Sequence, residues 1–137
     1  MQPAEHRRAY SETFTKAERI CSRRIIDRLF GGGNPSMAAF PLRAVYMPTD
    51  ATPEQPSVAV LISVPKRKLH HAVDRNRMKR QVREAYRRNK HTLLASMEAQ
   101  GKHLDIAFIC IADHPCTTTQ VTASVCKILR RINEKYT

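Results

Sequence analysis

The sequence has no long apolar run, and this excludes one broad class of protein. No stretch approaches the ~18 consecutive apolar residues that a membrane-spanning helix needs. The N-terminal residues, which include Glu5, Arg7 and Arg8, are not the apolar stretch of a signal peptide. We therefore expect a cytoplasmic protein with no membrane partner. With 137 residues, 42% hydrophobic and 26% charged, the composition is typical of one folded domain.

Cysteine pairs and clustered carboxylates are also missing. The four cysteines include no Cys-x-x-Cys pair, which favours reduced thiols that pack in the fold over a disulfide framework. Cys110, His114 and Cys116 are close together, but a fourth zinc ligand at suitable spacing is absent. The 12 acidic residues are scattered, without the Asp-x-Asp arrangement that suits a two-metal nuclease. We expect neither a metal site nor a catalytic residue in the protein itself.

Positive charge is what the sequence has in excess. It contains 24 Lys and Arg against 12 Asp and Glu, a formal net charge of +12. Such an excess implies a polyanionic partner. Eleven of the basic residues fall between Lys66 and Lys90, where only Asp74 and Glu84 oppose them. Most of the net charge is therefore concentrated in this one segment.

The densest part of the segment has the pattern of an amphipathic helix from Ala72 to about Asn89. One stripe would face the core, namely Met78, Val82, Ala85 and Tyr86. The other side carries two cationic stripes, Arg75, Lys79 and Arg83 and then Asn76, Arg80 and Arg87. Like charges stacked at this spacing cost ~0.2–0.5 kcal/mol per pair, and we expect no compensating acids. A bound anion is favoured over a merely solvated face.

Nucleic acid is the favoured polyanion. A membrane-binding helix carries Trp, Phe or Leu beside its cationic face, whereas this chain has no Trp and the helix's apolar residues match a core stripe. Arginine outnumbers lysine across the helix, which suits bidentate contacts to phosphates and structured RNA. His70 and His71 in the preceding turn are interpreted as further RNA contacts, with an acid–base pair as the alternative.

The N-terminal part predicts a tail followed by a helix. We expect a flexible tail at residues 1–13 and a single RNA-binding domain at residues 14–137. Thr15 to Glu18 has capping-box spacing, and a short helix capped by Ser22 should end at Phe30. The glycine triplet 31–33 follows a helix, so it is interpreted as a C-cap and linker rather than as a phosphate-binding loop.

Strands are predicted on both sides of the basic helix. Ala38 to Met47 is predicted as one strand, with Pro41 at its start or on a sheet edge and with residues 48–56 as the following loop. Ser57 to Val64 and His103 to Ile111 are apolar enough to be buried strands, and the order strand, helix, strand makes them parallel partners. His91 to Ala99 should be a short helix. A last helix, capped near Thr118 or Thr119, should bury Val121, Val125, Ile128, Leu129 and Ile132.

Three aromatic residues are candidates for stacking on RNA. Phe30, Phe40 and Tyr46 are predicted to line one face of the sheet, where an unpaired nucleotide could stack. Core packing is the competing interpretation and is at least as good for Phe30. Tyr46 is the preferred candidate because its hydroxyl tolerates exposure.

The basic segment also carries a family signature. The runs SVPKR (63–67) and AVDRNRMKRQVREAYR (72–87) closely resemble the signature of the bacterial ribonuclease P protein component. The most specific part is Arg75-Asn76-Arg77, followed by Lys79-Arg80 and Arg83. The likeness covers roughly Phe14 to Arg131.

The resemblance implies both a fold and a function. The fold is an α/β (α+β) two-layer sandwich with a small mixed sheet of about four strands, as in a domain of a ribosomal protein. Its arginine-rich helix lies in a left-handed β-α-β crossover, an exception to the right-handed rule. The implied function is that of the protein subunit of ribonuclease P. The catalytic RNA removes the 5′ leader of precursor tRNA with Mg²⁺ bound mainly by the RNA, while the protein binds that RNA and holds the leader in a cleft.

The implied RNA-binding residues lie in the turn and the helix of the basic segment. The family motif supplies Lys66, Arg67, Arg75, Asn76, Arg77, Lys79, Arg80 and Arg83, and the charge of the segment adds Lys68 and Arg87. Phe30, Phe40 and Tyr46 are the candidates for the leader-binding cleft. No DNA partner is expected. The alternatives are a non-catalytic RNA-binding or ribosome-associated protein and a self-sufficient nuclease, which the scattered acids disfavour.

Overall fold

A computed structural model describes residue 14 and residues 16–136. The predicted tail at residues 1–13 and the predicted cap Thr15 lie outside the described residues. The elements in chain order are a short 3₁₀ helix η1 (Lys16–Glu18), α2 (Arg23–Phe30), β1 (Ser36–Ala39), β2 (Leu42–Asp50), β3 (Val58–Ser63), α3 (Ala72–Asn89), α4 (His91–Ala99), β4 (Lys102–Cys110) and α5 (Thr118–Lys135).

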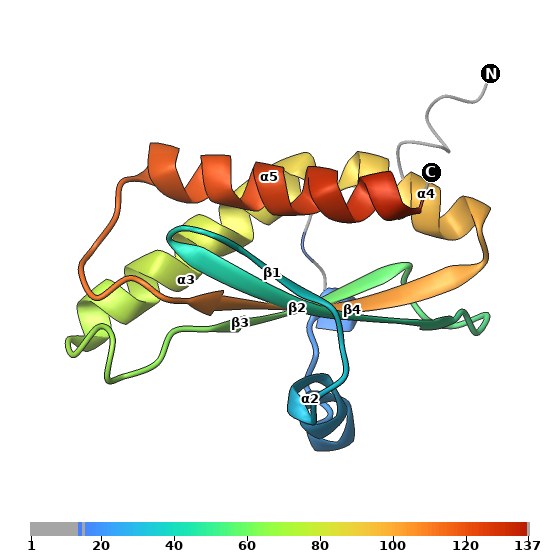
Figure 1. The fold of residues 1–137 in the computed structure, drawn as a ribbon, viewed down its shortest axis with the longest axis horizontal. Coiled ribbons are helices and arrows are strands. Elements are labelled where there is room, and N and C mark those ends of the chain that lie inside the picture. Colours follow the sequence, from blue (N-terminus) through green and yellow to red (C-terminus); the bar gives the residue numbers. More distant parts are fainter. Residues whose placement is uncertain (1–13, 15, 137) are drawn as a thin grey trace.

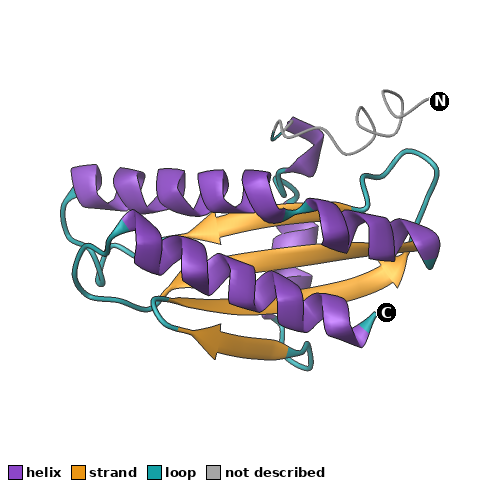
Figure 2. Ribbon diagram, turned by 90° about the horizontal axis from the view of Figure 1, so that it is seen from above, coloured by secondary structure: helices purple, strands orange, loops and turns teal. Residues whose placement is uncertain are grey.

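The strands form one mixed sheet in the order β1-β2-β4-β3 (Figure 1). β2 pairs antiparallel with β1 and β4, whereas β3 and β4 are parallel, as predicted. Between these parallel strands the chain passes through α3 and α4, which lie with α5 over one face of the sheet (Figure 2). This connection is the expected left-handed crossover. The predicted two-layer sandwich is confirmed.

The single strand predicted from Ala38 to Met47 is wrong, because this region is a hairpin. β1 and β2 pair antiparallel and are joined by a turn at Phe40 and Pro41, whose peptide bond is cis. Pro41 has no N–H to donate to a ladder, which suits a turn better than a strand. β2 then continues to Asp50, so the predicted loop begins later than expected.

The main core lies between the sheet and the helices α3, α4 and α5. The predicted stripe of α3 and the five predicted residues of α5 are all buried there, against Leu104, Ile106 and Phe108 of β4. Full burial of side chains of this size stabilises the fold by ~1.5–3 kcal/mol each. α5 is capped by Thr117, one residue before the predicted positions, and Gln120 completes a capping box.

Of the described α-helices, only α2 packs on the opposite face of the sheet (Figure 1). It begins at the predicted cap, where the Ser22 hydroxyl accepts a hydrogen bond from the Ile25 N–H at 3.4 Å, and it ends at Gly31. Leu29 is buried in a second, smaller core with Val45 and Ala107. Because α2 is only eight residues long, part of this face is left open.

β3 lies at an edge of the sheet, and the N-terminal segment covers part of that edge. The Ile20 N–H donates to the Val60 carbonyl at 3.0 Å, and Arg19 forms an isolated parallel bridge with the same residue. The Glu18 carboxylate binds Lys90 Nζ at 2.8 and 3.1 Å, and both residues are buried. Residues 18–20 are thereby attached to β3 and to the end of α3.

The four cysteines are free thiols, as expected. Cys110 and Cys116 are buried in the main core, Cys126 is half-buried and Cys21 is exposed. The prediction that the cysteines pack in the fold is therefore confirmed for Cys110 and Cys116, whereas Cys21 lies outside the core. Among the described residues, no helix combines the length and the hydropathy needed to cross a membrane.

Candidate RNA-binding surface

α3 presents cations to solvent along its first three turns. Asn76, Arg77 and Arg80 are exposed, and Lys79 and Arg83 are half-buried. Among residue 14 and residues 16–136, no carboxylate forms an ion pair with any of these four cations. Their N–H groups are available for phosphate oxygens, which prefer such charged, forked donors.

Arg75 has a structural role beside its predicted one. Its Nη1 donates to the Leu69 carbonyl at 3.0 Å and to the His70 carbonyl at 2.8 Å. These bonds hold the turn before α3, where the N-cap residue His71 supplies no side-chain hydrogen bond. A guanidinium has five N–H donors, so Arg75 can still contact RNA while it fixes the turn.

The end of α3 is partly neutralised, contrary to the expectation that compensating acids are missing. Glu84 accepts from Arg87 at 2.6 and 3.0 Å and from Arg88 at 3.0 Å. The hydrogen bonds from Arg87 and then from Arg88 lower the pKa of Glu84 to about 2. Arg87 is therefore already engaged by a carboxylate, unlike the cations in the first three turns.

Lys90 also departs from the sequence interpretation, which counted it in the basic surface segment. It is only 2% exposed, because its ammonium group is paired with Glu18 and lies 5.9 Å from the centroid of the Tyr86 ring. Lys90 therefore stabilises the fold, and the surface charge of the segment ends before it.

The turn before α3 extends the cationic surface. The N–H groups of Lys68 and Leu69 donate to the Pro65 carbonyl at 3.0 and 3.2 Å, and Leu69 is buried as an anchor. Lys66 and Arg67 are exposed and Lys68 is half-buried. Because Arg75 binds carbonyls of this turn, the predicted residues of the turn lie next to the first turn of α3.

The edge of β3 and the open sheet face each add one arginine that the sequence interpretation missed. A cavity of about 200 Å³ beside β3 is lined by Arg19 together with Lys79 and Arg83 of α3. A second cavity, of about 190 Å³, lies between α2 and β2 and is lined by Phe30 and Arg43. Arg43 could have been found, because it interrupts the apolar alternation of a strand and must therefore face away from the main core.

The three predicted stacking residues do not form one platform. Phe30 is 47% exposed at the end of α2 and lines the cavity with Arg43, which fits the predicted cleft. Phe40 is 57% exposed, but it occupies the hairpin turn at one end of the sheet. Tyr46 is 2% exposed in the main core, so the prediction that it offers a ring to a nucleotide is wrong.

A buried charge pair lies beneath the open face. His103 Nε2 lies 2.8 Å from an Asp105 carboxylate oxygen, and Nδ1 lies 2.7 Å from the Pro56 carbonyl oxygen. Burial lowers the pKa of His103, but the hydrogen bonds to Asp105 and Pro56 outweigh it and raise the pKa above its usual value. Because both ring nitrogens face acceptors, the surroundings favour the protonated imidazole.

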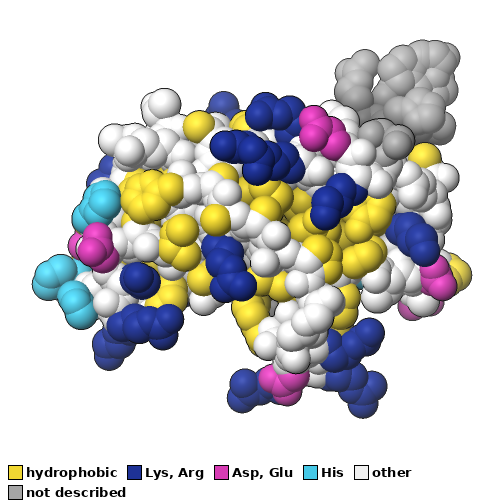
Figure 3. Space-filling view, viewed as in Figure 1, with side chains coloured by type: hydrophobic (Ala, Val, Ile, Leu, Met, Phe, Trp, Pro, Cys, Tyr) yellow, Lys and Arg dark blue, Asp and Glu magenta, His cyan; other side chains and the backbone are white. Residues whose placement is uncertain are grey.

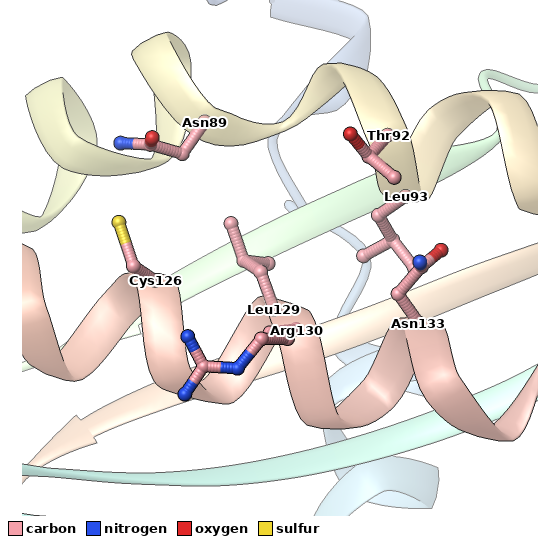
Figure 4. A pocket seen from close by; sticks show the side chains of 7 residues that line it. All are labelled: Asn89, Thr92, Leu93, Cys126, Leu129, Arg130 and Asn133. Carbon is pink, nitrogen blue, oxygen red and sulfur yellow. The ribbon is translucent and has the colours of Figure 1, made fainter.

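Other hollows and charges lie outside this surface. A cavity of about 190 Å³ separates α5 from α3 and α4, with Cys126 and Leu129 pointing from α5 into it (Figure 4).

On the face drawn in Figure 3, basic side chains are scattered over α5 and α2, with hydrophobic side chains between them. Arg23, Arg24 and Arg28 on α2 are exposed.

The residues of the surface fit binding rather than metal chemistry. The only acids in the basic segment from Lys66 to Lys90 are Asp74 and Glu84, and Glu84 is paired with two arginines. Within the part of the chain that the structure describes, no three His, Cys, Asp or Glu side chains gather as metal ligands would. The surface can therefore neutralise and orient an RNA backbone, while it offers no carboxylate cluster for Mg²⁺.

Comparisons with known proteins agree with this fold. The family model described as Ribonuclease P matches residues 14–133. The ribonuclease P protein component of Porphyromonas gingivalis is 36% identical over 118 residues, which cover 86% of this chain and 85% of that protein. Its counterpart in Chlorobium phaeobacteroides is 37% identical over 103 residues, 70% of each chain.

A solved structure extends the likeness to three dimensions. The RNase P protein of Staphylococcus aureus superimposes with a TM-score of 0.65 at 26% identity, over 89% of this chain and 100% of that one. The fold, the sequence relatives and the family model all lead to the same assignment. This chain belongs to the ribonuclease P protein component family.

Proposed function

We propose that this protein is the protein subunit of ribonuclease P and acts in the cytoplasm with a catalytic RNA. It would assist the Mg²⁺-dependent endonucleolytic removal of the 5′ leader from precursor tRNA. The observation that carries the proposal is the row of unpaired cations on α3, in a chain of this family. A helix whose Arg77, Arg80 and Arg83 form no ion pair with a carboxylate of the described residues is suited to bind phosphates.

The protein's part in the reaction is electrostatic and positional. The turn at Lys66 and Arg67 and the first turns of α3 bind the catalytic RNA through phosphate contacts, with release of counterions. The open sheet face is proposed to hold the leader, with Phe30 as a stacking residue and Arg19 and Arg43 as phosphate contacts. Cations placed between two RNA strands reduce their mutual repulsion, so less Mg²⁺ is needed to bring them together.

Mg²⁺ is proposed to be bound mainly by the RNA subunit. When bound, it supplies the activated water and the stabilisation of negative charge that phosphodiester hydrolysis needs. The two acids of the basic segment, Asp74 and the arginine-paired Glu84, do not form a set of ligands for it.

Reconstitution tests the proposal directly. The purified protein, added to the ribonuclease P RNA of the same organism, should restore cleavage of a precursor tRNA at low Mg²⁺ concentration. A variant with Arg77, Arg80 and Arg83 replaced by alanine should fail to do so. A variant with the exposed α5 residues Lys127, Arg130 and Arg131 replaced by alanine removes the same charge and should still work.

The outcomes separate the proposal from its alternatives. If the wild-type protein gives no rescue, the proposed function is wrong. Cleavage by the protein without RNA would identify a self-sufficient nuclease. If the RNA that co-purifies from cells is ribosomal rather than ribonuclease P RNA, the protein is a ribosome-associated RNA-binding protein instead.

A further inference from the structure

Three loops meet at one end of the sheet, beside the start of α3. They are the β1–β2 turn at Phe40 and Pro41, the basic turn at residues 64–71 and the β4–α5 loop at residues 111–117, all at the left of Figure 1. The Ile111 N–H donates to the Pro41 carbonyl at 2.9 Å, which attaches the last loop to the hairpin. The Gln81 side chain donates to the Cys116 carbonyl at 3.1 Å, which attaches it to α3.

Phe40 is exposed at this end and lies beside an imidazole. Its ring is 57% exposed, and its centroid lies 6.0 Å from that of His114, with the two planes inclined by 34°. His114 Nδ1 is 3.0 Å from an Asp113 carboxylate oxygen, which orients the imidazole. A single exposed apolar residue is ordinary on a protein surface. The Phe40–His114 pair, in which a hydrogen bond orients one ring, belongs neither to the core nor to the open sheet face.

The charge around this pair is mostly positive. The adjoining turn exposes Lys66, Arg67, His70 and His71, and Lys68 is half-buried there. Asp113 opposes them, and its hydrogen bond with His114 lowers its pKa, an effect to which the nearby Lys68 charge adds. In Figure 3, histidine, basic and hydrophobic side chains lie together at the left end of the molecule. An aromatic ring amid cations is the arrangement by which proteins hold single-stranded nucleic acid.

We propose that Phe40, supported by His114, is a stacking platform for an unpaired RNA base whose flanking phosphates lie along the turn at Lys66 to Lys68. This inference rests on the proposed RNA-binding function and adds a contact outside the open sheet face. The base would stack on the outer side of the Phe40 ring, because two centroids 6.0 Å apart leave no room for a third ring. Stacking of this kind tolerates any base, since each has a π-face.

A tryptophan at position 40 provides the test, because the chain has no tryptophan of its own. In the full-length variant Phe40→Trp, the indole keeps an aromatic platform and reports stacking by its fluorescence. Oligoadenylate should quench this emission strongly, and an abasic oligoribonucleotide of equal length and charge should quench it weakly. The variant Ala51→Trp, at an exposed position at the opposite end of the sheet, is the matched control and should respond equally weakly to both.

Affinity gives a second measurement. Phe40→Ala should weaken binding of oligoadenylate by about 5- to 150-fold, the range for loss of one stacked base, and should leave binding of the abasic oligomer unchanged. Phe40→Tyr should bind like the wild type. Because the side chain is largely exposed, each variant should unfold at the same urea concentration as the wild type, which verifies that the fold is intact.

Some results would overturn the inference without touching the proposed function. If Phe40→Trp is quenched equally by the oligomers with and without bases, or if Phe40→Ala binds both as the wild type does, there is no stacking platform here. If Phe40→Ala loses self-association at unchanged RNA affinity, the ring is a contact between copies of the protein. The proposed function is tested separately, by whether the wild-type protein restores precursor-tRNA cleavage.

Discussion

The two ends of the basic segment use the same residue types for opposite purposes. From Lys66 to Arg83 the cations are exposed or half-buried, and none forms an ion pair with a carboxylate among the described residues. From Glu84 to Lys90 they are paired, with Glu84 binding two arginines on the surface and Glu18 binding Lys90 in the interior. A run of positive charge in a sequence therefore contains both a binding surface and part of the scaffold, and only the placement of the acids separates them.

Breaking the buried pair tests the scaffold end and should have the largest effect. Lys90→Met leaves the Glu18 carboxylate buried without its ammonium partner, which should lower the free energy of unfolding by about 3–5 kcal/mol in urea titrations. The double variant with Glu18→Leu removes both charges and should recover much of the loss. A decrease below about 1 kcal/mol would show that the pair behaves like an exposed one.

Removing cations from the first turns of α3 tests the binding end. Arg77→Ala with Arg80→Ala should weaken binding to ribonuclease P RNA about tenfold or more, because both side chains are exposed and unpaired. The slope of log K against log[salt] should flatten by about 0.7–0.9 for each lost phosphate contact. Lys90→Met also removes one positive charge, but it should leave this slope unchanged because Lys90 is buried. An unchanged slope in the arginine variant would remove α3 from the phosphate surface.

The buried pair of His103 and Asp105 should make the stability of the fold depend on pH. His103 has a raised pKa in the folded protein, so its pairing with Asp105 stabilises the fold fully below the unfolded value of about 6.5. This contribution is lost as the pH rises through the folded value. Compared with the wild type, His103→Gln should therefore be destabilised by about 1–3 kcal/mol near pH 6 and less near pH 8 in urea titrations. A difference that does not vary with pH would mean that folding does not raise the pKa of His103.

Glu84 marks the boundary between the two ends, and changing it should have the smallest effect. Glu84→Gln removes the carboxylate shared by Arg87 and Arg88, so RNA binding should tighten a few-fold and its salt dependence should steepen. Because the pKa of Glu84 is about 2, the effect should be the same at every pH at which the protein is handled. Weaker binding in this variant would show instead that Glu84 holds its arginines in the position that RNA requires.

Local periodicity made α3 predictable from sequence. Its bounds, Ala72 and Asn89, agree with the prediction and its four predicted core residues are all buried, because a helix repeats its burial every 3.6 residues over five turns. The hairpin at Phe40 was missed because Phe40 falls on the even-numbered alternation of Leu42, Ala44 and Tyr46, whereas the buried positions change parity at the turn, from Ala39 to Leu42. The prediction for Tyr46 failed for a separate reason, because its face of the sheet is covered by α5.

Long-range pairing made the rest of the site unpredictable. Glu18 and Lys90 are 72 positions apart, and nothing in the local pattern connects them. Arg19 and Arg43 join the surface only because the sheet brings their strands and loops together. By contrast, the shared carboxylate of Glu84 lies three and four residues from its partners and was within reach of a helical reading.

Arg19 and Ile20, which follow η1 and pair with β3, also affect whether copies of this protein associate with one another. An edge strand presents unpaired N–H and C=O groups to which a strand of another molecule can add. The single hydrogen bond from Ile20 to Val60, with the Arg19 bridge beside it, occupies the middle of the β3 edge. A protein shortened to begin after Ile20 would expose that edge beside a cationic surface, and edge-to-edge aggregation would then compete with assembly on RNA.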